Sequence, residues 1–183
     1  VKVDGAEATV DNVKAGTYKL SRPFNIATKG ELTGLAKDFI SFILSKEVQA
    51  VVTDNKYIAV NDAAESFVSD GSSGQIAVGG SSSVSPVMEK LIEAYKSVNP
   101  NASIDLQTSD STSGMTGAMD GTFAIGMASR ELKDEEAAQL TGTAIALDGI
   151  AVIVNPANTI DELSMDQIKS IYVGDITDWG DLA

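Results

Sequence analysis

From residue 75 onward, short apolar segments alternate regularly with amphipathic segments, and few folds accommodate such an order. The pattern predicts strands at 75–80, 103–108 and 122–128, and one or two more within 143–155. It predicts helices between and after them, at 86–98, 114–121, 131–140 and 164–173. The helix at 86–98 places its apolar side chains on one face: Met88, Leu91, Ile92, Tyr95 and Val98. Strands alternating with helices at this spacing predict an α/β domain of three layers, in which helices flank a largely parallel sheet.

The first 60 residues carry a second patterned stretch. A strand is predicted at 23–28, followed by a helix, then a second helix through 47–52 and a strand at 57–60. The first helix is predicted from apolar side chains spaced along one face: Leu32, Leu35, Ala36, Phe39, Ile40 and Ile43. Residues 1–22 mix turn residues with short apolar pieces and are interpreted as a peripheral arm. The Ser, Gly and Asp-rich stretch NDAAESFVSDGSSGQ (61–75) is interpreted as a linker.

Composition excludes several classes of function. The 183 residues include no histidine and no cysteine, which removes Ser-His-Asp catalysis, thiolate sites and disulfides. No cofactor, metal site or catalytic residue is therefore predicted. The net charge of −13 argues against nucleic acid or an anionic membrane as a partner. No apolar run is long enough to span a membrane, and no signal peptide is visible, so a soluble chain without its export signal is expected.

Three predicted strand-to-helix junctions share one chemical feature. GGSSSVSP (79–86), SDSTSG (109–114) and MASREL (127–132) each place hydroxyl groups next to a predicted helix start. The backbone N–H groups there are unpaired, and the helix dipole is positive. In a parallel sheet these junctions lie at one edge, the carboxyl ends of the strands, where open α/β folds bind ligands. The sequence therefore predicts an anion site at this edge.

A simpler interpretation exists for every one of these residues. Serines before helices are commonly N-caps, each contributing about 1 kcal/mol of stability, and for any single junction capping is the better explanation. Three junctions on one edge favour binding. Arg130, which could be an ordinary surface arginine, is better explained there as a partner for an oxyanion, because its planar guanidinium suits phosphate. The acidic pair Glu135 and Glu136 is interpreted as a solvated face.

Several long motifs resemble the phosphate-binding proteins of Pst-type ABC transporters. They are IAVGGSSSVSPVMEKLIEAY, QTSDSTSGMTGAMDGTFAIGMASRELKDEE, IALDGIAVIVNPAN and IKSIYVGDITDW, together with the strand and helix region of residues 1–60. In that family the segment similar to 76–183 comes first and the segment similar to 1–60 comes last. The resemblance therefore implies a circularly permuted lobe 1 with most of lobe 2 missing. Engineering is the simplest origin for this order, and a natural rearrangement is the alternative.

The resemblance also implies a division of the chain. The fold would be one lobe of a type II periplasmic binding protein. Residues 1–22 would be an arm left from the second lobe or the crossover, and 23–60 the carboxyl-terminal part of lobe 1. Residues 61–75 would be the linker, and 76–183 the amino-terminal part of lobe 1. Segments 23–60 and 76–183 would form one domain.

The family's phosphate loops fall on residues of the three junctions. The resemblance assigns phosphate binding to Ser82 and Ser83, to Ser111 with Thr112 alongside, and to Ser129 with Arg130. Some members have an aspartate in the third loop that accepts the proton of hydrogen phosphate, whereas this chain has Ser129 there. We hypothesise that Asp110 is the acceptor.

The expected function is thus inorganic phosphate binding, derived from the substrate-binding component of a phosphate ABC transporter. For the parent protein, a transporter permease would be the partner and the outer face of the membrane or the periplasm the location. A single lobe lacks roughly half of the hydrogen-bond donors to the anion, and each lost bond to a charged group costs roughly 1.5–3 kcal/mol of binding free energy. The expected dissociation constant for phosphate is therefore about millimolar, or binding is absent. The alternative is a non-binding isolated-lobe scaffold or engineered folding module, which could self-associate as a homodimer across the exposed half-cleft. A hydrolase is disfavoured because histidine is absent.

Overall fold

The computed structural model describes residues 1–61 and 63–182; Asp62 of the expected linker and the terminal Ala183 lie outside the described residues. The chain divides into two compact units. Unit 1 comprises residues 1–21 and 149–183, and unit 2 comprises residues 22–148. This division differs from the predicted one, which grouped 149–183 with 76–148. The reason is tertiary, because residues after Gly149 bond to the first twenty: the Tyr18 hydroxyl donates to the Ile150 carbonyl at 2.7 Å.

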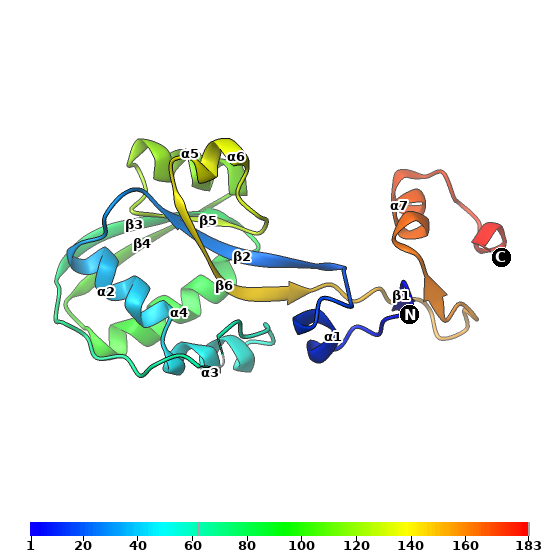
Figure 1. Cartoon of the computed structure of the whole chain (residues 1–183), viewed down its shortest axis with the longest axis horizontal. Coiled ribbons are helices and arrows are strands. Elements are labelled where there is room, and N and C mark those ends of the chain that lie inside the picture. Colours follow the sequence, from blue (N-terminus) through cyan, green and yellow to red (C-terminus); the bar gives the residue numbers. More distant parts are fainter. Residues whose placement is uncertain (62, 183) are drawn as a thin grey trace. The chain divides into compact units, whose positions relative to one another are not determined.

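Unit 2 is built on a five-stranded mixed sheet (Figure 1). Its strands are β2 (Ser21–Thr28), β3 (Gly74–Ser81), β4 (Ala102–Ser109), β5 (Ile125–Ala128) and β6 (Thr141–Gly149), in the order β4-β3-β5-β2-β6. β3 runs parallel to both β4 and β5, whereas β2 runs antiparallel to β5. The predicted strand at 57–60 is reduced to a single bridge between Ile58 and Leu147.

Helices cover both faces of this sheet, which confirms the three-layer α/β fold. The helices of unit 2 are α2 (Gly34–Ile43), α3 (Lys46–Asp54), α4 (Ser85–Val98), α5 (Ser111–Asp120) and α6 (Asp134–Ala137). Figure 1 shows α2, α3 and α4 on one face and α5 and α6 on the other. Two apolar clusters match these layers: Phe24 and Ile26 of β2 belong to the larger one, and Ala27 belongs to the smaller one with Met115 of α5.

Most of the predicted helical faces are buried. Leu35, Phe39, Ile40 and Ile43 of α2 pack into the core, as do Met88, Leu91, Ile92 and Tyr95 of α4. Val98 is different, because it ends α4 and is 52% exposed. The helix predicted at 131–140 is much shorter, since only Asp134–Ala137 are helical.

The segment expected to be an unpatterned linker is partly fixed by a buried carboxylate. Asp38 of α2 accepts hydrogen bonds from the Ser69 hydroxyl at 2.7 Å, the Asp70 N–H at 3.0 Å and the Tyr95 hydroxyl at 2.6 Å. Asn99 also donates to the Ser72 carbonyl at 2.8 Å. Residues 69–72 are therefore tied to α2 and α4 just before β3 begins.

Unit 1 contains little regular structure. β1 (Lys2–Val3) pairs in parallel with β7 (Glu162–Leu163), and the helices are α1 (Val10–Lys14), α7 (Met165–Val173) and a 3-10 turn, η1 (Trp179–Leu182). Ser164 and Gln167 form the capping box at the start of α7. In the described part of the chain, no helix is long and apolar enough to cross a membrane.

Candidate functional site

The three predicted junctions meet at one edge of the sheet in unit 2. The parallel register of β3 with β4 and β5 aligns their carboxyl ends. Two hydrogen bonds then join the junctions directly. The Ser82 N–H donates to the Ser109 carbonyl at 3.0 Å, and the Ser129 N–H donates to the Ser111 hydroxyl at 3.1 Å. The structure thus brings the three loops together: the first and second are joined through Ser82 and Ser109, and the second and third through Ser111 and Ser129.

Glycines allow the second junction to approach the other two so closely. Gly80 has φ +135°, and a Cβ there would lie 2.3 Å from the Met127 carbonyl oxygen. A Cβ on Gly114 of α5 would lie 2.6 Å from the same oxygen and 2.7 Å from the Gly80 Cα. Only glycine fits where two backbones come this near. The first turn of α5 is therefore held against the ends of β3 and β5.

Asp110 is the N-cap of α5. Its Oδ1 accepts hydrogen bonds from the N–H groups of Thr112 at 2.8 Å and Ser113 at 3.0 Å, and its Oδ2 accepts one from the Ser113 hydroxyl at 2.7 Å. The bonds from the Ser113 hydroxyl and N–H, followed by that from the Thr112 N–H, lower the pKa of the Asp110 carboxyl. Asp110 is consequently an ionised cap, with Oδ2 engaged by a single protein donor.

The first junction leaves the hydroxyls of Ser82 and Ser83 available, whereas that of Ser85 bonds to the Ser81 carbonyl and to Thr108. α4 begins at Ser85 without a side-chain cap, and Pro86 is its second residue rather than the predicted first. Ser82 is exposed and Ser83 is half-buried. Among the described residues, neither of these hydroxyls, nor the Ser83 N–H, has a hydrogen-bond partner. These groups are donors that the protein itself does not use.

The third junction differs from the prediction, because Ser129 and Arg130 do not start a helix. α6 begins at Asp134, with Lys133 as its N-cap. What positions the loop is a pair of side chains that the sequence analysis did not select. The Asn25 side chain donates a hydrogen bond to the Arg130 carbonyl at 2.9 Å. The Glu136 carboxylate accepts two hydrogen bonds, one from each terminal nitrogen of the Arg130 guanidinium, both at 2.8 Å.

Glu136 corrects the interpretation of the acidic pair as a solvated face. Its side chain is 3% exposed, against 30% for Arg130, and it also accepts the Lys133 N–H at 2.8 Å. The hydrogen bonds from Arg130 keep the pKa of the Glu136 carboxyl low despite its burial. The same hydrogen bonds raise the pKa of the guanidinium. The only sequence signal for this pair was an arginine six residues before a glutamate.

Most, but not all, of the hydrogen-bond donors of the Arg130 guanidinium are used within the protein. Nη1 donates to the Glu131 carbonyl as well as to Glu136, and Nη2 reaches the Thr112 hydroxyl at a long 3.5 Å. Within the described residues, Nε has no acceptor. An oxyanion can therefore take Nε and compete for the weak bond to Thr112, while Glu136 holds the plane of the group.

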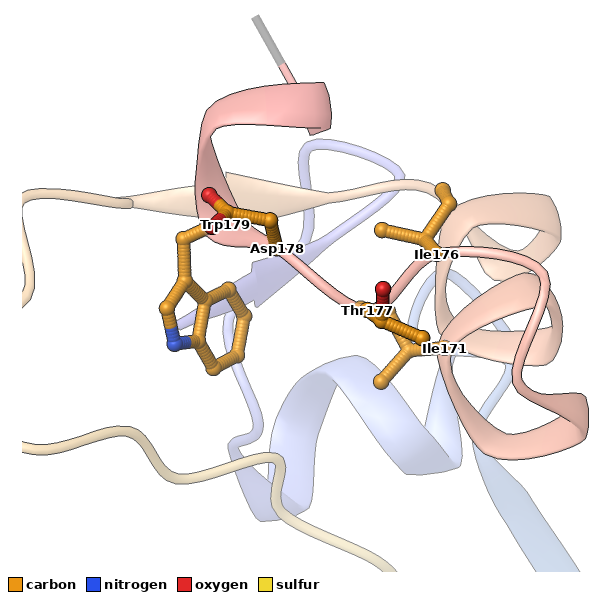
Figure 2. Close-up of a pocket in the computed structure, with 5 residues that line it drawn as sticks. All are labelled: Ile171, Ile176, Thr177, Asp178 and Trp179. Atoms are coloured by element: carbon orange, nitrogen blue, oxygen red, sulfur yellow. The ribbon is translucent and has the colours of Figure 1, made fainter.

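A separate cavity in unit 1 does not fit an anion. Figure 2 shows Ile171, Ile176, Thr177, Asp178 and Trp179 around a space of about 130 Å³. Its one ionisable group is a carboxylate, which repels negative charge. Across the described residues, no group of three or more acidic side chains is arranged to hold a metal ion.

Known proteins resemble this chain over its whole length. Residues 65–183 match the PBP superfamily domain. The phosphate-binding protein PstS 2 of Streptococcus agalactiae serotype V is 51% identical over 185 residues, covering 100% of this chain and 63% of that protein. PstS 2 of Streptococcus pneumoniae serotype 4 is 47% identical over 179 residues, covering 98% of this chain and 62% of its own length.

Two solved structures also resemble this chain. A phosphate-binding protein of a phosphate ABC transporter from S. pneumoniae superposes with a TM-score of 0.94 at 46% identity, over 100% of this chain and 71% of its own. A phosphate ABC transporter substrate-binding protein from Clostridium perfringens, solved with bound phosphate, matches 60% of this chain and 45% of its own, with a TM-score of 0.52 and 44% identity.

These matches explain why the segment 1–60 precedes the segment 76–183, and they show the family of the chain. Because the S. agalactiae protein covers the whole chain, the junction between the two rearranged parts occurs in a natural relative, and engineering is not needed to explain it. The chain spans 63% of the length of that relative. A domain match over residues 65–183 and a fold shared with a solved relative lead to one conclusion: the chain belongs to the PBP superfamily.

Proposed function

We propose that this chain binds inorganic phosphate at the carboxyl edge of β3, β4 and β5. The observation that carries the proposal is the convergence of three hydroxyl-bearing loops, joined by the Ser82 and Ser129 N–H bonds, around an arginine fixed by Glu136. Relatives named as phosphate-binding proteins support it, as does the C. perfringens relative solved with bound phosphate.

The donors available suit a tetrahedral dianion. The hydroxyls of Ser82, Ser83 and Ser129, the Ser83 N–H and Arg130 Nε can each give a charge-assisted hydrogen bond. Thr112 and Ser111 lie beside them, at the positive end of the ten-residue helix α5. Local donors of this kind attract an anion even though the whole chain carries a net charge of −13.

Asp110 is proposed to select for a protonated oxyanion. An ionised Oδ2 with one protein donor can accept the proton of hydrogen phosphate, which sulfate lacks at neutral pH. Asp110→Asn tests this, because asparagine still caps a helix but cannot supply a charged acceptor. We expect a small loss of thermal stability, because the charge of the cap is lost, and a smaller preference for phosphate over sulfate in competition titrations. An unchanged preference would remove Asp110 from the site.

The binding itself is tested by titrating phosphate into the labelled protein and following backbone amides by NMR. We expect saturable shifts of Ser82, Ser83, Ser111, Ser129 and Arg130, with sulfate as the competing anion. Ser83→Ala should weaken binding by roughly 10-fold, the equivalent of one charge-assisted bond. Ser103→Ala, at the exposed amino end of β4, is the matched control and should leave binding unchanged. Absence of shifts at tens of millimolar phosphate would overturn the proposal.

The proposal extends to a role in transport. Relatives that belong to phosphate ABC transporters point to a transporter permease as the partner and to the outer face of the membrane as the place of action. Cross-linking of this chain to such a permease, dependent on phosphate, is the expected result. Equal cross-linking with and without phosphate would count against delivery of the anion.

A further inference from the structure

Thr108 is a polar residue at the end of an otherwise apolar row of side chains on β4. Ala102 and Ile104 belong to the larger apolar cluster, which also contains much of α4, and Leu106 packs against it. Because side chains alternate between the two faces of a strand, Thr108 continues this row. Valine has the same branched shape as threonine. What distinguishes Thr108 from an apolar residue at this place is therefore the hydrogen bond of its hydroxyl.

That hydrogen bond links the second junction to the first. The Thr108 hydroxyl donates to Ser85 Oγ at 2.9 Å. The Ser85 hydroxyl donates in turn to the Ser81 carbonyl at 3.2 Å, across the loop that carries Ser82 and Ser83. A carbonyl oxygen only accepts hydrogen bonds, so the Ser85 proton points to Ser81 and the Thr108 proton points to Ser85. The two hydroxyls thus form a relay with one direction.

The relay closes the base of the first loop. The Ser81 carbonyl also accepts the Val84 N–H at 3.0 Å. Ser81 and Ser85 are each 3% exposed, and Val84 is fully buried. Between these anchored ends, Ser82 is exposed and Ser83 is half-buried. Because a buried donor or acceptor that loses its partner is costly, the relay restricts the movement of the loop.

The hydroxyl of Ser85 does not serve the helix in which it lies. A serine that stabilises a helix start usually stands just before the first turn and accepts a backbone N–H. Ser85 is instead the first residue of α4, Val84 is its N-cap, and the helix has no side-chain cap. The Ser85 hydroxyl is directed back into the loop. Capping therefore does not explain this serine.

We propose that Thr108 and Ser85 are positioning residues for phosphate, which hold the loop so that Ser82 and Ser83 are ordered before the anion arrives. Neither residue donates to the anion, because both hydroxyl protons are used within the protein. A loop that is already ordered loses less conformational freedom on binding, which strengthens binding without any new contact. The inference rests on the proposed phosphate site and adds two residues to it.

The first experiment needs no ligand. Thr108→Val keeps the branched side chain at an exposed position and removes the hydroxyl. NMR relaxation of the ligand-free protein should show the backbone order parameter of Ser83 falling from about 0.85 toward 0.6. Thr108→Ser, which keeps the hydroxyl, should retain the order. The matched control is Thr53→Val, which removes a hydroxyl that bonds to the Gln49 carbonyl at 2.9 Å within α3.

The second experiment measures phosphate binding by titration. Thr108→Val and Ser85→Ala should each weaken binding by roughly 3- to 10-fold, the equivalent of one ordinary hydrogen bond. Thr108→Ser and Thr53→Val should leave it unchanged. The effect of Thr108→Val should shrink in a Ser83→Ala background, because the relay acts through the loop that carries Ser83. A general loss of stability would reduce binding equally in both backgrounds.

The two proposals fail in different ways. Unchanged order of Ser83 in Thr108→Val, an equal loss of affinity in the Ser83→Ala background, or no rescue by Thr108→Ser would each overturn the positioning role. In those cases the unaltered chain would still bind phosphate. Absence of phosphate binding by the unaltered chain would instead overturn the proposed function, and the positioning role with it.

Discussion

Asp38 is a buried carboxylate outside the candidate site, and its hydrogen bonds decide its charge state. Burial alone would raise its pKa. The hydrogen bonds from Tyr95, the Asp70 N–H, Ser69 and Asn99 outweigh burial and lower the pKa below its ordinary value of 3.8. The same carboxylate makes Tyr95 harder to ionise: burial first, and then the bond to Asp38, raise the pKa of Tyr95 to about 12. Asp38 is thus a charged anchor for residues 69–72.

A carboxyl with a lowered folded pKa stabilises the protein above its unfolded pKa, and this contribution is lost as the pH falls through the folded value. We expect stability to fall below about pH 4. Asp38→Asn should cost ~1–3 kcal/mol at pH 7, because a side-chain amide faces donors it cannot satisfy, and should flatten this acid dependence. Ser69→Ala, which removes one bond, should cost less. Urea unfolding at several pH values measures both, and equal acid dependence in Asp38→Asn would contradict the assignment.

The Arg130 and Glu136 pair is a second strong interaction at the residue scale. Because Glu136 is almost fully buried, Arg130→Met leaves a carboxylate without its cation and should cost about 3 kcal/mol. The double variant Arg130→Met with Glu136→Met should recover most of that loss, since no buried charge remains. Chemical denaturation of the four proteins gives the coupling energy. A coupling near zero would show that the pair contributes only to binding.

At the scale of elements, α5 depends on glycine for its position. Gly114→Ala would gain about 1 kcal/mol of helix propensity. Against that, its Cβ would meet the Met127 carbonyl and the Gly80 Cα at less than 3 Å, both of them rigid backbone. The steric cost should exceed the gain in helix propensity, so the free energy of unfolding should fall by ~1–3 kcal/mol. Phosphate binding should also weaken, because the first turn of α5 shifts. Thr116→Ala, an exposed change on the same helix, should be neutral or slightly stabilising in thermal unfolding.

The elements also show where patterns alone mislead. Residues 57–60 and 150–154 both read as strands, yet neither forms one among the described residues. A strand is stabilised by its neighbour, and 57–60 reaches β6 through only one bridge. Helix α6 is shorter than its polar pattern suggested, because the loop before it is held by Arg130 and Glu136 instead.

For the whole molecule, the two units should respond differently to the ligand. The candidate site lies entirely in unit 2, so phosphate at 100 times its dissociation constant should stabilise that unit by ~2.7 kcal/mol. Unit 1, with its small core, should exchange its amides faster and show little change with phosphate. Hydrogen exchange measured with and without phosphate separates these outcomes. Equal protection of β3 and α7 amides by phosphate would mean that the units unfold together.

Residue patterns alone predict the three-layer α/β fold, most helix and strand positions, and the loops of the candidate site. Periodicity encodes which face of an element is buried, and hydroxyls at strand ends can be read residue by residue. These patterns do not predict that 149–183 group with 1–21, that Glu136 holds Arg130, or that 150–154 belong to no strand. Each of these depends on which groups meet once the chain has folded, and the periodicity of a segment contains no information about that.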